Sequence, residues 1–197
     1  MRTTAPALAP FLRSDTQGEI LALLLLNPDD AHSLADIARA VDAPPAVVHK
    51  EVSRLVEAGV LRDSRQGRSR LVRANPAYRL LRPLTELITG TYGPVPILTR
   101  ALAAVPGIEA AFIYGSWAAR HQGHVGDQPR DVDVLVVGNA ARTELNEAST
   151  VAEGKLHMPV SITKVSPEAW AASEDPFLVT IRSRPLVTLD LGTGVTT

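Results

Sequence analysis

The stretch FIYGSWAARHQGHVGDQPRDVDVLVV, residues 112–137, decides how the second half of this chain folds. The apolar segments at its two ends predict β-strands over residues 108–114 and 132–137. Gly115 and Ser116 open a short predicted helix directly after the first strand, and a polar loop rich in turn formers follows it. A strand, a tight Gly-Ser junction, a helix and a second apolar strand predict a layered α/β arrangement.

Two carboxylates and the Gly-Ser pair carry the chemistry of this stretch. Asp131 and Asp133 stand at i and i+2 where the second strand begins, so their side chains should project from one face. Mg²⁺ prefers carboxylate and phosphate oxygens as ligands. At the start of a helix, Gly115 and Ser116 can bring backbone N–H groups and a hydroxyl close to a phosphate. The pattern indicates a site for phosphate and metal.

The other elements of the second half alternate between helix and strand. Helices are predicted over residues 95–105, over 141–153 and from 166 onward, and strands over 160–165 and 186–191. We therefore expect an α+β protein in which residues 94–197 form a small α/β domain with a mixed sheet.

Composition narrows the class of protein. The chain has 197 residues, enough for two small domains, with 45% hydrophobic and 21% charged residues, as is ordinary for a globular protein. It has no cysteine, which excludes thiolate metal sites and a cysteine nucleophile. The longest apolar run, residues 20–26, is too short to span a bilayer, and no signal peptide precedes it. A cytoplasmic protein with no membrane partner is expected.

Charge is distributed unevenly along the chain. Residues 1–76 have a net charge of +1, whereas residues 94–197 have a net charge of −3. Within the first part, residues 61–73 hold five arginines against one aspartate. A local basic cluster of this density is the usual electrostatic sign of a nucleic-acid partner.

The first part of the chain predicts three helices and a hairpin. The helices are expected over residues 16–26, 33–41 and 44–58, and the hairpin over residues 60–72 with its turn at residues 64–67. Ser33, with Asp36 three residues later, forms a loose capping box at the second helix. Val48, Val52 and Leu55 form the buried stripe of the third helix.

Two short helices, a tight turn between them and a basic hairpin form the helix-turn-helix pattern with a wing. The stretch LADIARAVDAPPAVVHKEVSRLVEAGVL, residues 34–61, followed by the hairpin, resembles the winged helix-turn-helix domains of ArsR-like and MarR-like bacterial regulators. The resemblance implies that residues 10–76 bind double-stranded DNA, with the third helix in the major groove. The residues expected at the DNA are Ala46, His49, Lys50, Ser53, Arg54, Arg62, Arg65, Arg68 and Arg70. A protein-interaction module with solvated arginines is the alternative.

Residues 77–93 predict a connector helix between the two domains. Tyr78, Leu81, Leu84 and Leu87 stand three apart and predict one apolar stripe. This stripe would pack on the first domain or pair with its copy in a second chain. The resemblance to winged-helix regulators implies a homodimer in which this stripe pairs with its copy in the second chain.

The stretch GSWAARHQGHVGDQPRDVDVLVV, residues 115–137, resembles the signature of the minimal nucleotidyltransferases of the DNA polymerase beta superfamily. The resemblance covers about residues 95–190. It implies that Gly115 and Ser116 bind nucleotide phosphate and that Asp131 and Asp133 are catalytic metal ligands. The cofactors implied are Mg²⁺ and a nucleoside triphosphate.

One departure from that family concerns a third carboxylate, which the family places on a neighbouring strand. Ser161 stands in that place here. A serine hydroxyl is a weak Mg²⁺ ligand and a poor general base at neutral pH. Asp127, Glu168 or Asp190 would have to replace the missing group.

Two functions follow from these observations. The first is a DNA-binding transcription regulator whose nucleotidyltransferase-like domain binds Mg²⁺ and nucleotide, or a partner protein, in a toxin–antitoxin setting. The second is an active nucleotidyltransferase of antitoxin type, which transfers NMP from NTP to a hydroxyl of RNA or protein. The missing third carboxylate favours the first function, and the retained Gly-Ser and Asp-Val-Asp residues favour the second.

Overall fold

The computed structural model describes residues 12–67, 69–172 and 175–192. The chain forms two compact units, unit 1 with residues 1–93 and unit 2 with residues 94–197, and each has helices and a β-sheet of its own. The protein is therefore of the mixed α and β class, as expected. In the described part of the chain, no helix has both the length and the apolar character needed to cross a membrane.

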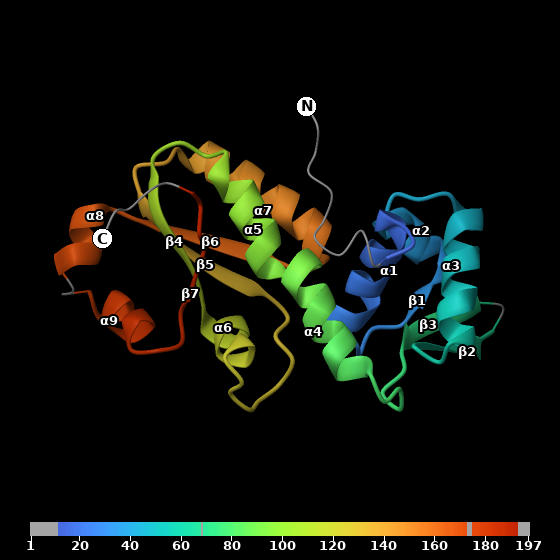
Figure 1. Ribbon diagram of the computed structural model, residues 1–197. Helices are drawn as coiled ribbons and strands as arrows, with labels where there is room; N and C mark the ends of the chain where they lie inside the picture. Colours follow the sequence, from blue (N-terminus) through green and yellow to red (C-terminus); the bar gives the residue numbers. More distant parts are fainter. Residues whose placement is uncertain (1–11, 68, 173–174, 193–197) are drawn as a thin grey trace. The chain divides into compact units, whose positions relative to one another are not determined.

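Unit 1 consists of helices around a small sheet (Figure 1). Its described elements are α1 (Asp15–Leu26), β1 (His32–Ser33), α2 (Leu34–Ala40), α3 (Pro45–Glu57), β2 (Leu61–Gln66), β3 (Ser69–Ala74) and α4 (Leu81–Tyr92). The strands pair antiparallel in the order β1-β3-β2. The three helices predicted for this part are confirmed to within one or two residues. Strand β1 has two residues, which is too short for a pattern to reveal.

Helix α1 lies at the centre of unit 1. Ser14 caps it by accepting a hydrogen bond from the backbone N–H of Gln17. Residues 20–25 are all buried, because α2, α3, α4 and β3 pack around this helix. A Cβ atom on Gly18 would lie 2.2 Å from the Tyr92 hydroxyl oxygen. The close approach of α4 to α1 therefore depends on the absence of a side chain at Gly18.

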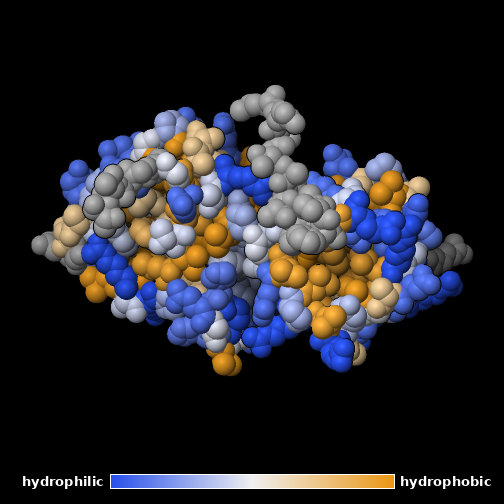
Figure 2. Space-filling model, viewed as in Figure 1, coloured by the Kyte–Doolittle hydropathy of each residue, from blue (hydrophilic) through white to orange (hydrophobic). Residues whose placement is uncertain are grey.

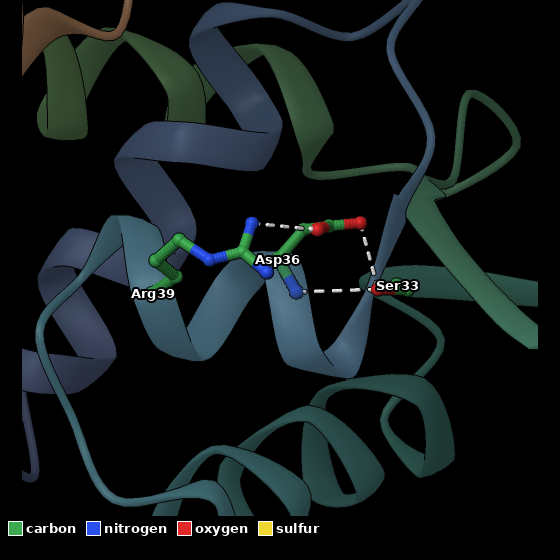
Figure 3. A network of polar contacts seen from close by, with 3 residues as sticks. All are labelled: Ser33, Asp36 and Arg39. Carbon is green, nitrogen blue, oxygen red and sulfur yellow. Dashed lines mark hydrogen bonds and ion pairs between the residues drawn. The ribbon is translucent and has the colours of Figure 1, made fainter.

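Helix α2 begins at the predicted cap, shown in Figure 3. Ser33 Oγ accepts a hydrogen bond from the backbone N–H of Asp36 at 3.2 Å and donates one to Asp36 Oδ2 at 2.7 Å. Arg39 forms an ion pair with Asp36 Oδ1 at 3.0 Å. The hydrogen bond with Ser33, followed by that with Arg39, holds the pKa of Asp36 below its ordinary value. The cap predicted from the sequence is confirmed.

Helix α3 buries the stripe expected of it, and the hairpin that follows is longer than predicted. Val48, Val52 and Leu55 are buried in the core of unit 1. Strands β2 and β3 stay paired as far as Gln66 and Ser69. Residues 64–66, predicted as turn, are therefore strand, and the turn lies between Gln66 and Ser69. Such a tight turn needs few residues when a glycine supplies a positive φ angle, as Gly67 does at +60°.

Helix α4, in the connector region, packs on α1 within unit 1. Ile88 and Tyr92 are buried there, and the Tyr92 hydroxyl donates a hydrogen bond to Asp15 Oδ1 at 2.8 Å. Leu87 of the predicted stripe does not pack on unit 1, since it is 57% exposed, while Ile88 is fully buried. A spacing of three drifts around a helix with 3.6 residues per turn, so the i, i+4 neighbour of Leu84 takes the buried place.

Unit 2 contains one mixed sheet with helices on both faces (Figure 1). Its described elements are α5 (Pro94–Ala103), β4 (Ile108–Tyr114), α6 (Gly115–His121), β5 (Val132–Gly138), α7 (Arg142–Leu156), β6 (Val160–Val165), α8 (Pro167–Ala172), α9 (Pro176–Arg182) and β7 (Val187–Thr188). The strand order is β6-β5-β4-β7, with β5 and β6 parallel and the other pairs antiparallel. The mixed sheet is confirmed. Helix α9 was not predicted, and β7 is shorter than expected.

The sheet of unit 2 has a core on each face. Helices α5 and α7 pack over one face, where Val134 is buried. Helices α8 and α9 close a smaller core on the other face around Leu135, Leu178 and Ile181. Because side chains alternate along a strand, Asp133 shares the second face with Leu135. The carboxylate thus lies at one end of a face whose other end is apolar.

Candidate functional sites

The surface of α3 presents most of the side chains predicted to face a ligand. Ala46, His49 and Lys50 are exposed. Ser53, one turn further along, is half-buried, and its hydroxyl oxygen accepts a hydrogen bond from Arg70 Nη1 at 3.4 Å. This contact joins α3 to strand β3, so the exposed side of the helix and the hairpin form one continuous surface.

Arg54, also on α3, has a partner inside unit 1. Its Nη1 lies 2.9 Å from Glu51 Oε1, and the Glu51 side chain is only 10% exposed. Glu51 Oε2 is buried and has no hydrogen-bond partner among the described residues. A buried carboxylate needs a compensating charge, so Arg54 stabilises unit 1 in addition to any contact with a ligand.

The hairpin places arginines directly opposite one another. Arg62 faces Arg73 across the two strands, and Arg65 faces Arg70. Like charges at opposed positions of an antiparallel pair destabilise it. One acid offsets part of this repulsion, since Asp63 Oδ2 lies 2.6 Å from Arg70 Nε. The hairpin therefore keeps a surplus of positive charge that folding alone does not require.

The two arginine pairs lie on opposite faces of the hairpin. Arg65 and Arg70 share the face of buried Val72, and Arg70 there contacts α3, whereas Arg62 and Arg73 lie on the other face. Hydrophilic residues surround the hairpin in Figure 2. Arg73 belongs to the basic stretch but was missed as a site residue, because only the strand register reveals its pairing. Arg68, also predicted at the DNA, lies outside the described residues.

In unit 2, three polar residues lie side by side across the sheet. Asp133 on β5 is the register partner of Tyr114 on β4 and of Ser161 on β6. All three side chains are on the α8/α9 face. The strand neighbour of Asp133 on the β6 side thus offers a hydroxyl in place of a carboxylate.

Gly115 packs directly against Asp133. Its φ angle is +75°, and a Cβ atom there would lie 2.6 Å from Asp133 Oδ2. Only glycine both adopts this backbone conformation without strain and leaves room for the carboxylate. Ser116 follows as an exposed residue on α6. The structure therefore places Gly115 of the Gly-Ser pair directly against Asp133.

Asp131 differs from Asp133 in its surroundings. It is exposed and lies in a bend just before β5, whereas Asp133 is half-buried within the strand. Burial, and then the nearby negative charge of Asp131, raise the pKa of Asp133. A cation between the two carboxylates would relieve both effects.

Two further residues of this site were not predicted from the sequence. Burial raises the pKa of the Tyr114 hydroxyl, a hydrogen bond with Thr163 lowers it, and the charge of Asp133 raises it again, with a net upward shift. The Tyr114 side chain therefore spans from β4 toward β6, close to the carboxylate. Tyr114 adjoins the Gly-Ser pair in sequence, but only the pairing of the strands brings it next to Asp133 and Thr163.

The donor set of this site fits a divalent cation that a ligand helps to hold. Asp131 and Asp133 supply two carboxylates, and Mg²⁺ is commonly bound by one or two carboxylates together with substrate phosphates. Within the described ranges, no group of three or more His, Asp or Glu residues gathers around a possible metal position. Asp127, Glu168 and Asp190 thus form no such group with the two aspartates.

Comparisons with known proteins show no family for this chain, so its function is argued from its own residues. No family model matches the sequence, and no curated protein matches it. Among solved structures, BpsR of Bordetella bronchiseptica, a protein whose DNA binding is regulated by 6-hydroxynicotinic acid, is similar to part of it. The match has 28% identity and a TM-score of 0.31, and it covers 39% of this chain and 62% of BpsR.

Proposed function

We propose that this protein is a DNA-binding transcription regulator and that unit 1 contacts the duplex. The observation that carries this proposal is the pair of opposed arginines on each face of the hairpin, Arg62 with Arg73 and Arg65 with Arg70. Their mutual repulsion destabilises the free protein, and a polyanion would relieve it. Arginine clusters on one exposed element are the usual electrostatic footprint of nucleic-acid binding.

Helix α3 would supply the sequence-dependent contacts. His49 and Lys50 are exposed on it, and Ser53 is tied to the hairpin through Arg70. In winged helix-turn-helix domains, which this part resembles, the corresponding helix enters the major groove. The hairpin arginines would then contact phosphates, which fixes the position of the helix without reading bases.

Binding to duplex DNA at several salt concentrations tests this proposal. We expect the variant with Arg62→Ala and Arg65→Ala to bind more weakly and to lower the slope of log affinity against log salt by about 2, roughly one for each lost phosphate contact. The matched control is Arg82→Ala, an exposed arginine of α4 with 91% of its side chain accessible. Equal affinity and slope for wild type and double variant would contradict the proposal.

For unit 2, we propose a nucleotidyltransferase-like domain that binds a nucleoside triphosphate with Mg²⁺. The support is the contact of Gly115 with Asp133 and the position of Asp131 next to it. Asp131 and Asp133 would hold the metal, and Gly115 and Ser116 would lie at the phosphates. When bound, Mg²⁺ would neutralise the negative charge of the carboxylates and phosphates.

A thermal shift with each nucleoside triphosphate tests the nucleotide site. We expect Mg²⁺ and NTP together to raise the unfolding midpoint of the wild type, because a ligand that binds only the folded state stabilises it. Asp133→Asn should abolish this shift. Glu147→Gln, which removes one exposed negative charge from α7, should leave it unchanged. A midpoint that responds to no NTP would contradict the proposal.

The alternative is an active nucleotidyltransferase of antitoxin type, acting on an RNA or protein hydroxyl. The close packing of Gly115 on Asp133 favours it, because a sheet that binds no ligand would need neither a glycine nor a half-buried carboxylate at this place. Ser161 beside Asp133 disfavours it, since a hydroxyl is a poor general base. Transfer of α-labelled NTP onto total RNA or total protein, lost in Asp131→Asn with Asp133→Asn, would establish the enzyme.

The proposed regulator is a homodimer in which α4 is the contact helix. Leu80, just before α4, and Leu87 on it are 51% and 57% exposed, although both are large apolar side chains. Light scattering of the wild type and of Leu80→Ser with Leu87→Ser tests this. A dimer that becomes a monomer in the variant supports the proposal, and a monomeric wild type contradicts it.

A further inference from the structure

A group of aromatic side chains covers the α8/α9 face of the sheet in unit 2. Phe112 stacks on Trp170 with ring centroids 5.4 Å apart, and Tyr114 meets Phe177 edge to face at 6.1 Å. The guanidinium of Arg182 lies 4.0 Å from the centre of the Trp170 ring. The cluster therefore joins β4, α8 and α9 on the same face that carries Asp133.

Most rings of this cluster are already occupied. Trp170 is half-buried between Phe112 and the Arg182 guanidinium. Tyr114 is also half-buried, and its hydroxyl is engaged by Thr163. Phe177 differs from both, since it is 46% exposed. Among the aromatic residues of the cluster, it is the most exposed.

Phe177 is also close to the proposed metal and phosphate site. Its ring contacts Tyr114, and Tyr114 is the strand partner of Asp133. One side chain thus separates the exposed ring from the half-buried carboxylate. Figure 2 shows hydrophobic surface on this side of unit 2, beside α8 and α9. Two carboxylates that could hold a cation and an aromatic cluster adjoin on one face, as a ligand with a cation-bound anionic part and a planar apolar part requires.

We propose that this face binds a purine nucleoside triphosphate, with the base stacked on Phe177 and the phosphates directed to Asp131 and Asp133 through the metal. The inference rests on the proposed nucleotide site and adds the part of the ligand that is recognised. An aromatic ring stacks on the π face of a nucleobase, and a purine offers a larger face than a pyrimidine. Stacking on one ring reads no base edge, so ATP and GTP should bind similarly.

Calorimetric titration of the full chain with Mg²⁺ present distinguishes the contribution of the base to binding affinity from that of the phosphates. The probes are ATP, GTP, CTP, UTP and inorganic tripolyphosphate, which carries the same phosphates without a base. We expect the wild type to bind ATP and GTP more tightly than CTP and UTP, and tripolyphosphate most weakly. Phe177→Ala should weaken ATP binding about tenfold, equal to ~1.4 kcal/mol, and leave tripolyphosphate binding unchanged.

Two further variants control for folding and for loss of apolar surface. Phe177→Leu keeps an apolar side chain without a π face, so it should weaken ATP binding like Phe177→Ala. Val179→Ala alters a residue of the same helix that is 48% exposed and two positions away, where a helix presents another side. Its affinity for ATP should equal that of the wild type.

The outcomes distinguish this inference from the proposed function. If wild type binds ATP and tripolyphosphate equally, or if Phe177→Ala binds ATP like the wild type, the stacking role is overturned and the metal and phosphate site stands. If Val179→Ala weakens ATP binding as much as Phe177→Ala, the effect belongs to α9 as a whole and the inference fails. If the wild type binds neither ATP nor tripolyphosphate, the proposed nucleotide site fails as well.

Discussion

The hairpin of unit 1 and the start of strand β5 in unit 2 both gather like charges, but in different surroundings. Arg62 and Arg65 on the hairpin are exposed, so water and salt screen their repulsion. Asp133, near the start of the inner strand β5, is half-buried, and its pKa is raised by burial and by Asp131. Repulsion at an exposed surface thus changes mainly the affinity for an ion of opposite charge. Repulsion in a partly buried site also changes protonation and the stability of the fold.

The largest effect is expected when the space next to the half-buried carboxylate of Asp133 is filled. Gly115→Ala should destabilise unit 2 by about 2–4 kcal/mol, because it adds both a strained positive φ angle and a clash with Asp133 Oδ2. Both tryptophans, Trp117 and Trp170, belong to unit 2, so urea unfolding followed by tryptophan fluorescence reports on this unit.

The matched control for that variant is Gly123→Ala. Gly123 has a φ angle of +87°, but a Cβ atom there would meet nothing within 4 Å, so only the backbone cost of about 1 kcal/mol should remain. Combining Gly115→Ala with Asp133→Ala should recover part of the lost stability, since the clashing oxygen is gone. Equal destabilisation by the two glycine variants would refute the close packing on Asp133.

A smaller effect is expected when the negative charge of the half-buried Asp133 is itself removed. The folded-state pKa of Asp133 lies above its ordinary value of 3.8, so the folded state holds the proton more tightly than the unfolded state. The free energy of unfolding therefore falls as the pH rises from the ordinary pKa of Asp133 through its raised pKa in the folded state. The Asp133→Asn variant lacks this charge. Its unfolding midpoint should lie a few degrees above that of the wild type at pH 7 in EDTA.

The pH dependence of this difference checks its cause. At about pH 3 the Asp133 carboxyl is protonated in both states, so the two midpoints should converge. Tryptophan fluorescence during heating measures both proteins. An Asn variant that is less stable than the wild type at pH 7 without metal would show that the carboxylate is compensated within the folded chain.

The smallest effect is expected in the exposed region, where a like-charge pair can be turned into an ion pair. Arg73→Glu places an acid opposite Arg62 and should stabilise unit 1 by about 0.2–1 kcal/mol while weakening DNA binding. Amide hydrogen exchange of β2 and β3 measures the first effect, and titration with duplex DNA the second. Arg79→Glu makes the same charge change at an exposed residue outside the strands. If Arg79→Glu lowers the affinity for DNA as much as Arg73→Glu does, the overall charge of the protein, and not the hairpin, decides binding.

The local elements of both units followed from short-range patterns in the sequence. Ser33 with Asp36 predicted the cap of α2, and Val48, Val52 and Leu55 predicted the buried face of α3, because these interactions lie within a few residues of one another. The strand over residues 108–114 was predicted with the bounds that β4 has. Errors arose where packing selects among similar residues, as with Ile88 in place of Leu87 on α4.

The sequence by itself determined which residues are candidates for binding in this protein: the arginines of residues 61–73 and the Gly-Ser and Asp-Val-Asp residues of unit 2. Only the tertiary structure decided which of them meet. Strand register sets Arg62 against Arg73 and places Ser161 beside Asp133, and the position of α9 brings Phe177 to Tyr114. Register and helix packing depend on contacts between residues far apart in the chain, which local periodicity does not encode.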